Sequence, residues 1–140
     1  SAWLAVYALP LAATLTADFI ADVDPLMPWH VTAFYPNYKF SSAKGFRRTE
    51  PDDLFRAVDI GSAAGLKYIY AGNRPGQMQS WEHTRCHHCG ETVVERHGFR
   101  VVANRVTPLG ACPACGGAIP GIWGKCPGTA GDGRVRPLRL

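Results

Sequence analysis

Two CxxC pairs constrain this sequence more than any other feature. Cys86–Cys89 and Cys112–Cys115 are separated by the 22 residues 90–111, and a glycine follows each pair. A CxxC turn points two thiolates toward one place, and a second such turn completes a tetrahedral set of sulfur ligands. Gly90 and Gly116 suit the positive φ angles expected just after each turn. The pattern therefore predicts a metal site formed by Cys86, Cys89, Cys112 and Cys115.

The residues between the two pairs have the alternation of β-strands. Residues 92–96 and 99–102 alternate with a period of two, and His97-Gly98 lies between them. This pattern predicts a β-hairpin with a two-residue turn. A CxxC turn, a hairpin and a second CxxC turn, in this order, are typical of a zinc ribbon.

Zinc is the expected metal, because this ion accepts four thiolates and then keeps no open coordination position. Iron is the alternative, since four thiolates in a tetrahedron also suit iron. Two disulfide bonds would instead need an oxidising compartment. We expect His87 and His88 to be solvent-facing turn residues, and Cys126 is a fifth cysteine outside the pattern.

The composition is that of a folded protein with a modest core. Of the 140 residues, 46% are hydrophobic and 19% are charged, which excludes wholesale disorder. The net charge of +4 becomes +2 (4 − 4 + 2) when four thiolates bind a divalent ion, so charge gives little support to nucleic-acid binding. Thiols kept free for metal indicate a cytoplasmic protein. The apolar residues 2–15 are too few to cross a bilayer, so no membrane partner is expected.

The N-terminal residues predict a strand followed by a helix. Residues 3–9 are apolar without alternation, which fits a strand buried on both faces, although a helix is equally compatible. Residues 11–23 have helical periodicity. The face of this helix that we expect to be buried carries Leu15, Phe19, Ile20 and Val23.

Residues 29–71 predict a strand, a helix and a second strand. The strands are expected at 29–34 and 66–71, and the helix begins with Thr49 as its N-cap and ends before Gly65. Connections of this length normally give a parallel pair with a right-handed crossover. The expected buried stripe of the helix is Leu54, Phe55, Val58 and Gly61.

We therefore expect an α/β fold, with the last βα units of a partial barrel followed by a small four-cysteine zinc ribbon. The expected domains are a partial α/β barrel segment at 1–82, the zinc ribbon at 83–123 and a disordered tail at 124–140. Residues 77–85 are expected to be a linker, and the apolar residues 119–123 to pack the ribbon against the sheet. Two or three strands cannot close a barrel, so the fold requires further strands.

Several segments resemble a family of radical-SAM enzymes. Residues 28–39 (PWHVTAFYPNYK) resemble the PWH-x-x-x-F-x-P-x-Y-K/R strand and loop of AmmeMemoRadiSam-system radical-SAM proteins, which are similar to pyruvate formate-lyase activating enzymes. Residues 64–76 resemble the last barrel strand and turn of that family. Both CxxC-Gly segments, the ArgxGlyPhe segment at 96–99 and residues 119–123 resemble its C-terminal ribbon. The resemblance covers residues 18–123 in order.

This resemblance implies a [4Fe–4S] cluster and S-adenosylmethionine, which together generate a 5′-deoxyadenosyl radical. In the family, a CxxxCxxC loop near the start of the barrel holds the cluster, and this chain contains no such loop. Three thiolates are needed to leave one iron open for the cofactor. The chain alone is therefore expected to be inactive, and its implied partner is the missing N-terminal half of the barrel, or a separate protein. A protein substrate is compatible with this interpretation.

The resemblance also points to residues that would bind the cofactor. His30 lies on a predicted barrel strand, while Tyr35, Tyr38 and Asn73 lie at strand ends, where barrel sites gather. His30, Tyr35 and Asn73 are the expected cofactor-binding residues. A hydrogen-bonded core histidine and an aromatic loop that only packs are the structural alternatives.

Two other functions fit parts of the sequence. A separate zinc-ribbon module could bind nucleic acid or a protein partner, because Arg85, Arg96, Arg100 and Arg105 lie around the ribbon. Acidic residues are interleaved with these arginines, which disfavours nucleic acid. A redox protein, whose CxxC pairs cycle between thiols and disulfides, is the third alternative.

Overall fold

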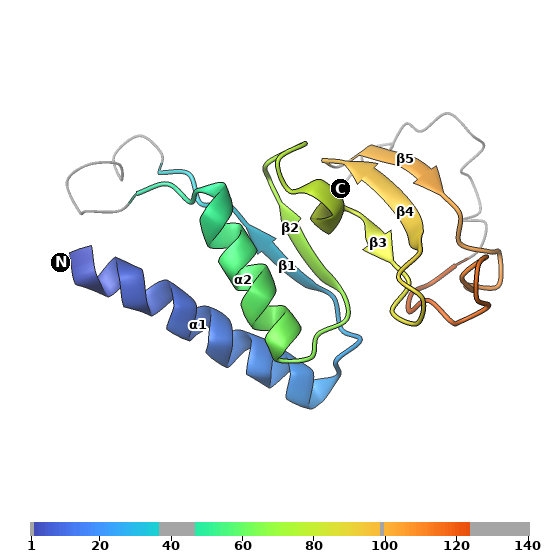
Figure 1. Cartoon of the computed structure of the whole chain (residues 1–140), viewed down its shortest axis with the longest axis horizontal. Coiled ribbons are helices and arrows are strands. Elements are labelled where there is room, and N and C mark those ends of the chain that lie inside the picture. The colour runs from blue at the N-terminus through green and yellow to red at the C-terminus, as the bar shows by residue number, and fades with distance from the viewer. Residues whose placement is uncertain (1, 37–46, 99, 124–140) are drawn as a thin grey trace, which may run out of the picture.

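The computed structural model describes residues 2–36, 47–98 and 100–123 and contains both helices and strands (Figure 1). The elements in chain order are α1 (Ala2–Val23), β1 (Trp29–Thr32), α2 (Pro51–Ala63), β2 (Ile69–Gly72), a 3₁₀ helix η1 (Gln79–Glu82), β3 (Thr84–Arg85), β4 (Thr92–His97) and β5 (Arg100–Asn104). They form a parallel β1–β2 pair and an antiparallel sheet in the order β3–β4–β5. Tyr38, Cys126 and the expected tail lie outside the described residues.

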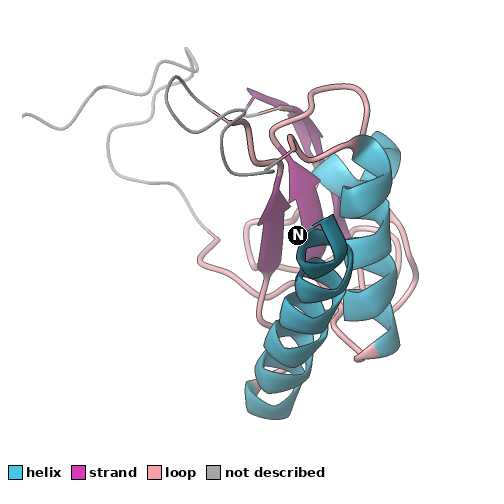
Figure 2. Ribbon diagram, turned by 90° about the vertical axis from the view of Figure 1, so that its left-hand side faces the viewer, coloured by secondary structure: helices cyan, strands magenta, loops and turns pink. Residues whose placement is uncertain are grey.

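The parallel pair confirms the predicted strand, helix and second strand. Trp29 pairs with Ile69, and Thr32 pairs with Gly72 at the other end. Both helices lie on one side of these strands (Figure 2), and α2 packs directly on them. The buried core between helices and strands consists of Ala17, Ala33, Leu54, Val58, Leu66, Ile69, Ala71 and Met78. The described residues form this two-stranded pair and no barrel, so the barrel stays a prediction.

The expected strand at residues 3–9 is wrong, because these residues belong to α1. An apolar run without alternation is compatible with either element, and here the helix continues through Pro10. A proline inside a helix lacks one backbone N–H donor. Further along, the Thr14 hydroxyl donates to the Pro10 carbonyl at 2.9 Å.

The buried face of α1 also differs from the expected one. Leu15, Phe19 and Val23 are 62%, 69% and 58% exposed, whereas Ala17 is fully buried. Ile20, also expected to be buried, does pack against the core. The small side chain of Ala17 lets α1 approach α2 closely, and this contact turns the larger apolar residues outward.

Helix α2 begins one residue later than expected. Its N-cap is Glu50, whose backbone N–H donates to Asp53 Oδ2 at 2.9 Å. Thr49 instead accepts a hydrogen bond from the Phe34 backbone N–H through its hydroxyl, at 2.9 Å. The expected stripe is confirmed for Leu54, Val58 and Gly61, which are buried. Phe55 is only partly buried.

The antiparallel sheet corrects three local expectations. Strand β4 extends through His97, which pairs with Arg100, so His97 is a strand residue and not part of the expected two-residue turn. Residues 77–85 are not a linker, since they contain η1 and β3. Residues 119–123 pack on the ribbon and not on the parallel pair, because Ile119 lies in the cysteine core and Trp123 Nε1 donates to the Ile119 carbonyl at 2.7 Å.

Within the described part of the chain, no helix has the length and continuous apolar character that a bilayer crossing requires.

Gly61 provides a test of the contact between α2 and the parallel pair. A Cβ atom at this position would lie 2.8 Å from Trp29 Cζ3 and 2.9 Å from Ile69 Cδ1. Alanine favours a helix by about 1 kcal/mol over glycine, but overpacking costs about 1–3 kcal/mol. Because the added Cβ would lie under 3.0 Å from two side chains, the overpacking cost should be in the upper part of its range, and we expect Gly61→Ala to lower the free energy of unfolding by about 1–2 kcal/mol in urea titrations. Ser62→Ala, at an exposed neighbouring position, is the control, and equal stability of the two variants would contradict the packing.

Candidate metal centre and neighbouring pocket

The four predicted cysteines come together at one point of the ribbon. Their sulfur atoms all lie within 4.8 Å of one another. Cys86 Sγ lies 3.6 Å from Cys115 Sγ, and Cys89 Sγ lies 3.7 Å from Cys112 Sγ. A tetrahedral site with metal–sulfur bonds of ~2.3 Å has sulfur–sulfur edges of about 3.8 Å. The arrangement therefore fits one metal ion.

Both CxxC turns have the same backbone hydrogen bonds. The Gly90 N–H donates to the Cys86 carbonyl and the Gly116 N–H to the Cys112 carbonyl, each at 2.8 Å. The φ angles of Gly90 and Gly116 are +77° and +75°, as the sequence predicts. A side chain would strain the backbone in this conformation. Two equivalent turns thus present two pairs of sulfurs to each other.

Each turn places its first cysteine inside and its second outside. Cys86 and Cys112 are buried with Val93, Val94 and Ile119, while Cys89 and Cys115 are exposed. None of the four forms a disulfide. The sulfur atoms are therefore held by the ribbon core on one side and reached by solvent on the other.

The sulfurs shift one another's protonation. Burial opposes ionisation of Cys86, but the backbone N–H groups of Cys89 and His88 stabilise its thiolate, so its pKa falls to about 7. The Glu91 N–H favours the Cys89 thiolate, yet desolvation by the packed turns and the three neighbouring sulfurs outweigh it and raise the pKa of Cys89 to about 12. The Gly117 N–H and Cys89 favour the Cys115 thiolate, but desolvation, Cys86 and Cys112 outweigh them and raise the pKa of Cys115. Four thiolates in this volume need a cation.

The donor set favours a closed structural site. Four thiolates suit Zn²⁺, and they also suit iron, so sulfur geometry alone does not choose between the two metals. Either ion would have all four of its positions filled by the chain. A metal held here would crosslink the two turns and would offer no position to a substrate.

The two histidines of the first turn differ from the expected pair of solvent-facing residues. His87 is half-buried, and its Nδ1 lies 2.9 Å from the hydroxyl of the buried Tyr68. His88 is exposed, as expected, and its ring lies against Gly117 of the second turn. His87 therefore links the metal centre to the segment that leads into β2.

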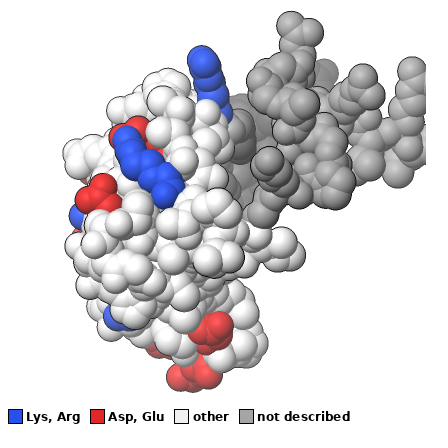
Figure 3. Space-filling model, turned by 90° about the vertical axis from the view of Figure 1, so that its right-hand side faces the viewer, with Lys and Arg blue, Asp and Glu red and all other residues white. Residues whose placement is uncertain are grey.

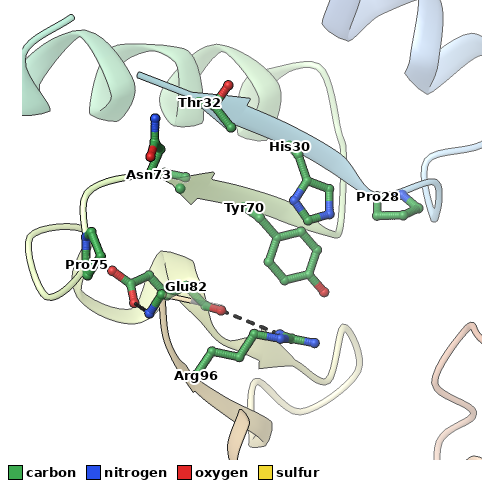
Figure 4. Close-up of a pocket in the computed structure, with 11 residues that line it drawn as sticks. Pro28, His30, Thr32, Tyr70, Asn73, Pro75, Glu82 and Arg96 are labelled. Atoms are coloured by element: carbon green, nitrogen blue, oxygen red, sulfur yellow. Dashed lines mark hydrogen bonds between the residues drawn. The ribbon is translucent and has the colours of Figure 1, made fainter. Parts of the chain in front are cut away.

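A pocket of about 400 Å³ lies between the parallel pair and the ribbon (Figure 4). We call it the Arg96 pocket. The rings of His30 and Tyr70 stack on one wall at 4.7 Å, and the Arg96 guanidinium lies 5.6 Å from the Tyr70 ring centre. Its polar lining consists of His30, Thr32, Tyr70, Asn73, Glu82 and Arg96.

The predicted cofactor-binding residues lie around this pocket. His30 and Asn73 line it, whereas Tyr35 does not belong to its lining. The Tyr35 hydroxyl instead donates to the Asn73 carbonyl at 3.2 Å, and Asn73 Nδ2 donates to the Ala33 carbonyl at 3.2 Å. Tyr35 and Asn73 thus lie together beyond the C-terminal ends of β1 and β2, whereas His30 lies within β1. The role of all three residues in binding a cofactor stays a prediction.

Glu82 is a site residue that sequence reasoning missed. Its side chain is buried, and its two carboxylate oxygens accept the backbone N–H groups of Gly76 and Gly98, both at 2.9 Å. It therefore joins the loop after β2 to the turn of the ribbon hairpin. The two glycines were visible in the sequence, but their pairing with one carboxylate was not.

We expect Cys112→Ser to abolish stoichiometric metal binding, because it removes a buried sulfur from the set. The melting temperature should fall by about 10 °C or more as the crosslink is lost. Elemental analysis and thermal circular dichroism measure both effects. His88→Ala, an exposed position in the same turn, should keep the metal. If His88→Ala loses metal as Cys112→Ser does, the assigned ligand set is wrong.

Glu82→Gln tests the carboxylate that joins the two loops. Glutamine keeps the shape of the side chain but replaces one acceptor oxygen with an NH₂ group, which cannot accept a backbone N–H. We expect the free energy of unfolding to fall by about 1–3 kcal/mol. Glu91→Gln, at an exposed position, should change it by less than about 0.5 kcal/mol. Indistinguishable urea midpoints for the two variants would argue against this role of Glu82.

Comparisons with known proteins identify a relative but no activity. The chain is 33% identical, over 93 residues, to a Methanocaldococcus jannaschii protein described as "Uncharacterized protein MJ0808". The match covers 66% of this chain and 26% of the relative, so the chain spans about a quarter of that protein. No protein-family model matches the chain. No solved structure matches it.

Proposed function

We propose that this chain is the C-terminal portion of a larger radical-SAM enzyme of the AmmeMemoRadiSam type, in which the four cysteines hold one structural zinc ion. The observation that carries the metal assignment is the set of four sulfurs within 4.8 Å. In this proposal the ribbon is a scaffold, since a closed four-thiolate site has no position for a substrate. The sequence resemblance over residues 18–123 supports the enzyme assignment.

Two features support a larger folded unit. Leu11, Leu15, Phe19 and Val23 place an apolar stripe on the outer side of α1, where they are 58–69% exposed. In the described residues, β1 pairs with β2 alone, which leaves its other edge without a strand. Further βα units would cover both, and the M. jannaschii relative is a longer protein.

The cluster and cofactor chemistry would depend on sequence outside this chain. The CxxxCxxC loop that holds a [4Fe–4S] cluster in the family is not present in these 140 residues. The four ribbon cysteines would all be used by the structural ion, which leaves none to hold a cluster with an open iron. In this proposal the chain supplies part of the wall of the enzyme's active site and the ribbon that stabilises it, and the cluster lies elsewhere in the enzyme. The free thiols of the ribbon fit a reducing, cytoplasmic setting.

The nucleic-acid alternative is less well supported by the surface. Arg96 lies over Tyr70, Arg85 donates to the Gly90 carbonyl, and Arg105 pairs with Glu95 at 3.2 Å. On the face drawn in Figure 3, basic and acidic side chains both occur among uncharged ones and form no continuous basic patch. Intramolecular contacts thus use the guanidinium groups of Arg85 and Arg105, while Arg96 faces the Arg96 pocket.

Metal analysis of the chain purified without chelator tests the scaffold assignment. We expect about one zinc per chain and no visible absorption, because Zn²⁺ with thiolates has no colour. Iron with a visible spectrum would contradict zinc, and iron with sulfide would mean that the ribbon cysteines hold a cluster. A chelator-treated sample that regains its thermal stability with Zn²⁺ is the control.

The enzyme assignment is tested separately on the natural gene. We expect the reading frame around this sequence to encode a CxxxCxxC loop upstream. The full product, reconstituted with iron and sulfide under a reductant, should cleave S-adenosylmethionine to 5′-deoxyadenosine. A variant lacking the loop cysteines is the matched control. A full-length product without that loop, or with no cleavage above this control, would refute the assignment.

A further inference from the structure

We propose that the Arg96 pocket binds a small organic anion, whose carboxylate or phosphate group is held by the Arg96 guanidinium. The cavity of about 400 Å³ lies within the range of small-molecule sites and is too small for a macromolecule. Pro28, Ala71 and Pro75 supply apolar wall, and a few polar groups converge among them.

Arg96 has donors available for such a ligand. Its Nη1 donates to Thr84 Oγ1 at 2.7 Å and to the Glu82 carbonyl at 3.5 Å. In the part of the chain that the structure describes, no ion pair includes Arg96, and its Nε and Nη2 donate to no protein atom. The Nε and Nη2 donors lie along one edge of the guanidinium, and this edge matches the two oxygens of a carboxylate or phosphate.

The Glu82 carboxylate, which also lines the pocket, does not form an ion pair with Arg96. Both oxygens of Glu82 accept backbone N–H groups, from Gly76 and Gly98. In Figure 4 the Glu82 carboxylate points toward Pro75, and only its backbone carbonyl meets Arg96. The Glu82 carboxylate is thus satisfied by two backbone donors, and in the described residues the positive charge of Arg96 is not neutralised by a carboxylate.

The guanidinium is also held in place before any ligand arrives. Its contact with the Tyr70 ring is a cation–π interaction, and His30 stacks on the same tyrosine. The Tyr70 hydroxyl lies 2.9 Å from Thr84 Oγ1, which itself accepts from Arg96. A fixed cation loses little conformational freedom on binding, which raises affinity. His30, Thr32 and Asn73 add polar groups opposite Arg96.

This inference deepens the proposed function, because the pocket is lined by the face of the parallel pair that would also line the enzyme's active site. It rests on the proposed function only for the role of the anion in the enzyme reaction. Anion binding to the chain is measured without a cluster, so it can fail while the metal and cleavage tests succeed, and the reverse also holds.

The test is a titration of the full zinc-loaded chain with benzoate, its neutral isostere benzamide, and inorganic phosphate, followed by NMR. We expect benzoate or phosphate to shift the Arg96 Nε–Hε signal in a saturable way and to leave the signal of Arg100 in place, since Arg100 is exposed and lies outside the pocket lining. Benzamide should bind at least about tenfold more weakly than benzoate. Saturation by phosphate as well would mean that charge alone is recognised, and saturation by benzoate alone would identify a carboxylate with an apolar body.

Two variants locate the site. Arg96→Gln should weaken binding of the active anion by at least about tenfold, and the matched control Arg100→Gln should leave it within about twofold. The wild-type NMR titration decides the matter if Arg96→Gln does not fold. Equal binding of benzoate and benzamide, no shift of the Arg96 signal with either anion, or equal effects of the two variants would overturn the proposal.

Discussion

The convergence of four sulfur atoms is the constraint on which the ribbon depends. Among the described residues its buried core has five members, and two of these are the predicted ligands Cys86 and Cys112. Val93, Val94 and Ile119 alone bury too little apolar surface to offset the entropy of ordering two turns and a hairpin. Four thiols packed this closely also resist ionisation together, as the raised pKa values of Cys89 and Cys115 show. A bound cation removes both difficulties at once, because it neutralises the sulfurs and crosslinks the turns.

The ribbon is joined to the parallel pair largely through polar contacts. Tyr68 forms a hydrogen bond with His87, Tyr70 forms one with Thr84, and the Arg96 guanidinium lies over the Tyr70 ring. The Glu82 carboxylate accepts hydrogen bonds from both the hairpin turn and the loop after β2. A continuous apolar interface would have filled the space between the two parts. Contacts made by a few long side chains hold the parts at a fixed spacing and leave a lined cavity between them.

Sequence patterns predicted what local chemistry determines. The spacing of the cysteines, the positive φ angles of Gly90 and Gly116, and the parallel pair all follow from short-range rules, and the structure has them. The errors arose where a tertiary partner decides. Helix α1 carries both an alanine face and a face of larger apolar residues, and only close packing on α2 selects Ala17 over Phe19. The role of Glu82 depends on two backbone N–H groups, and no sequence pattern predicts which carboxylate accepts them.

The candidate metal centre and the Arg96 pocket are connected through strand β4. Arg96 and Val94 both lie on β4, and Val94 is buried beside the cysteines. The pairing of β4 with β5 shifts register between Glu95 and Arg96, so the position of Arg96 depends on its hydrogen bonds to Thr84 Oγ1 and the Glu82 carbonyl as well as on the strand. In our proposals a metal ion would affect anion binding without touching the anion, because it would stabilise the ribbon that carries the guanidinium. We expect a chain without the metal to keep Tyr70 and His30 stacked on the parallel pair and to hold Arg96 less firmly against them. In our two proposals the structural ion and the binding surface are separate, so a closed four-thiolate site can lie next to a pocket that binds an anion.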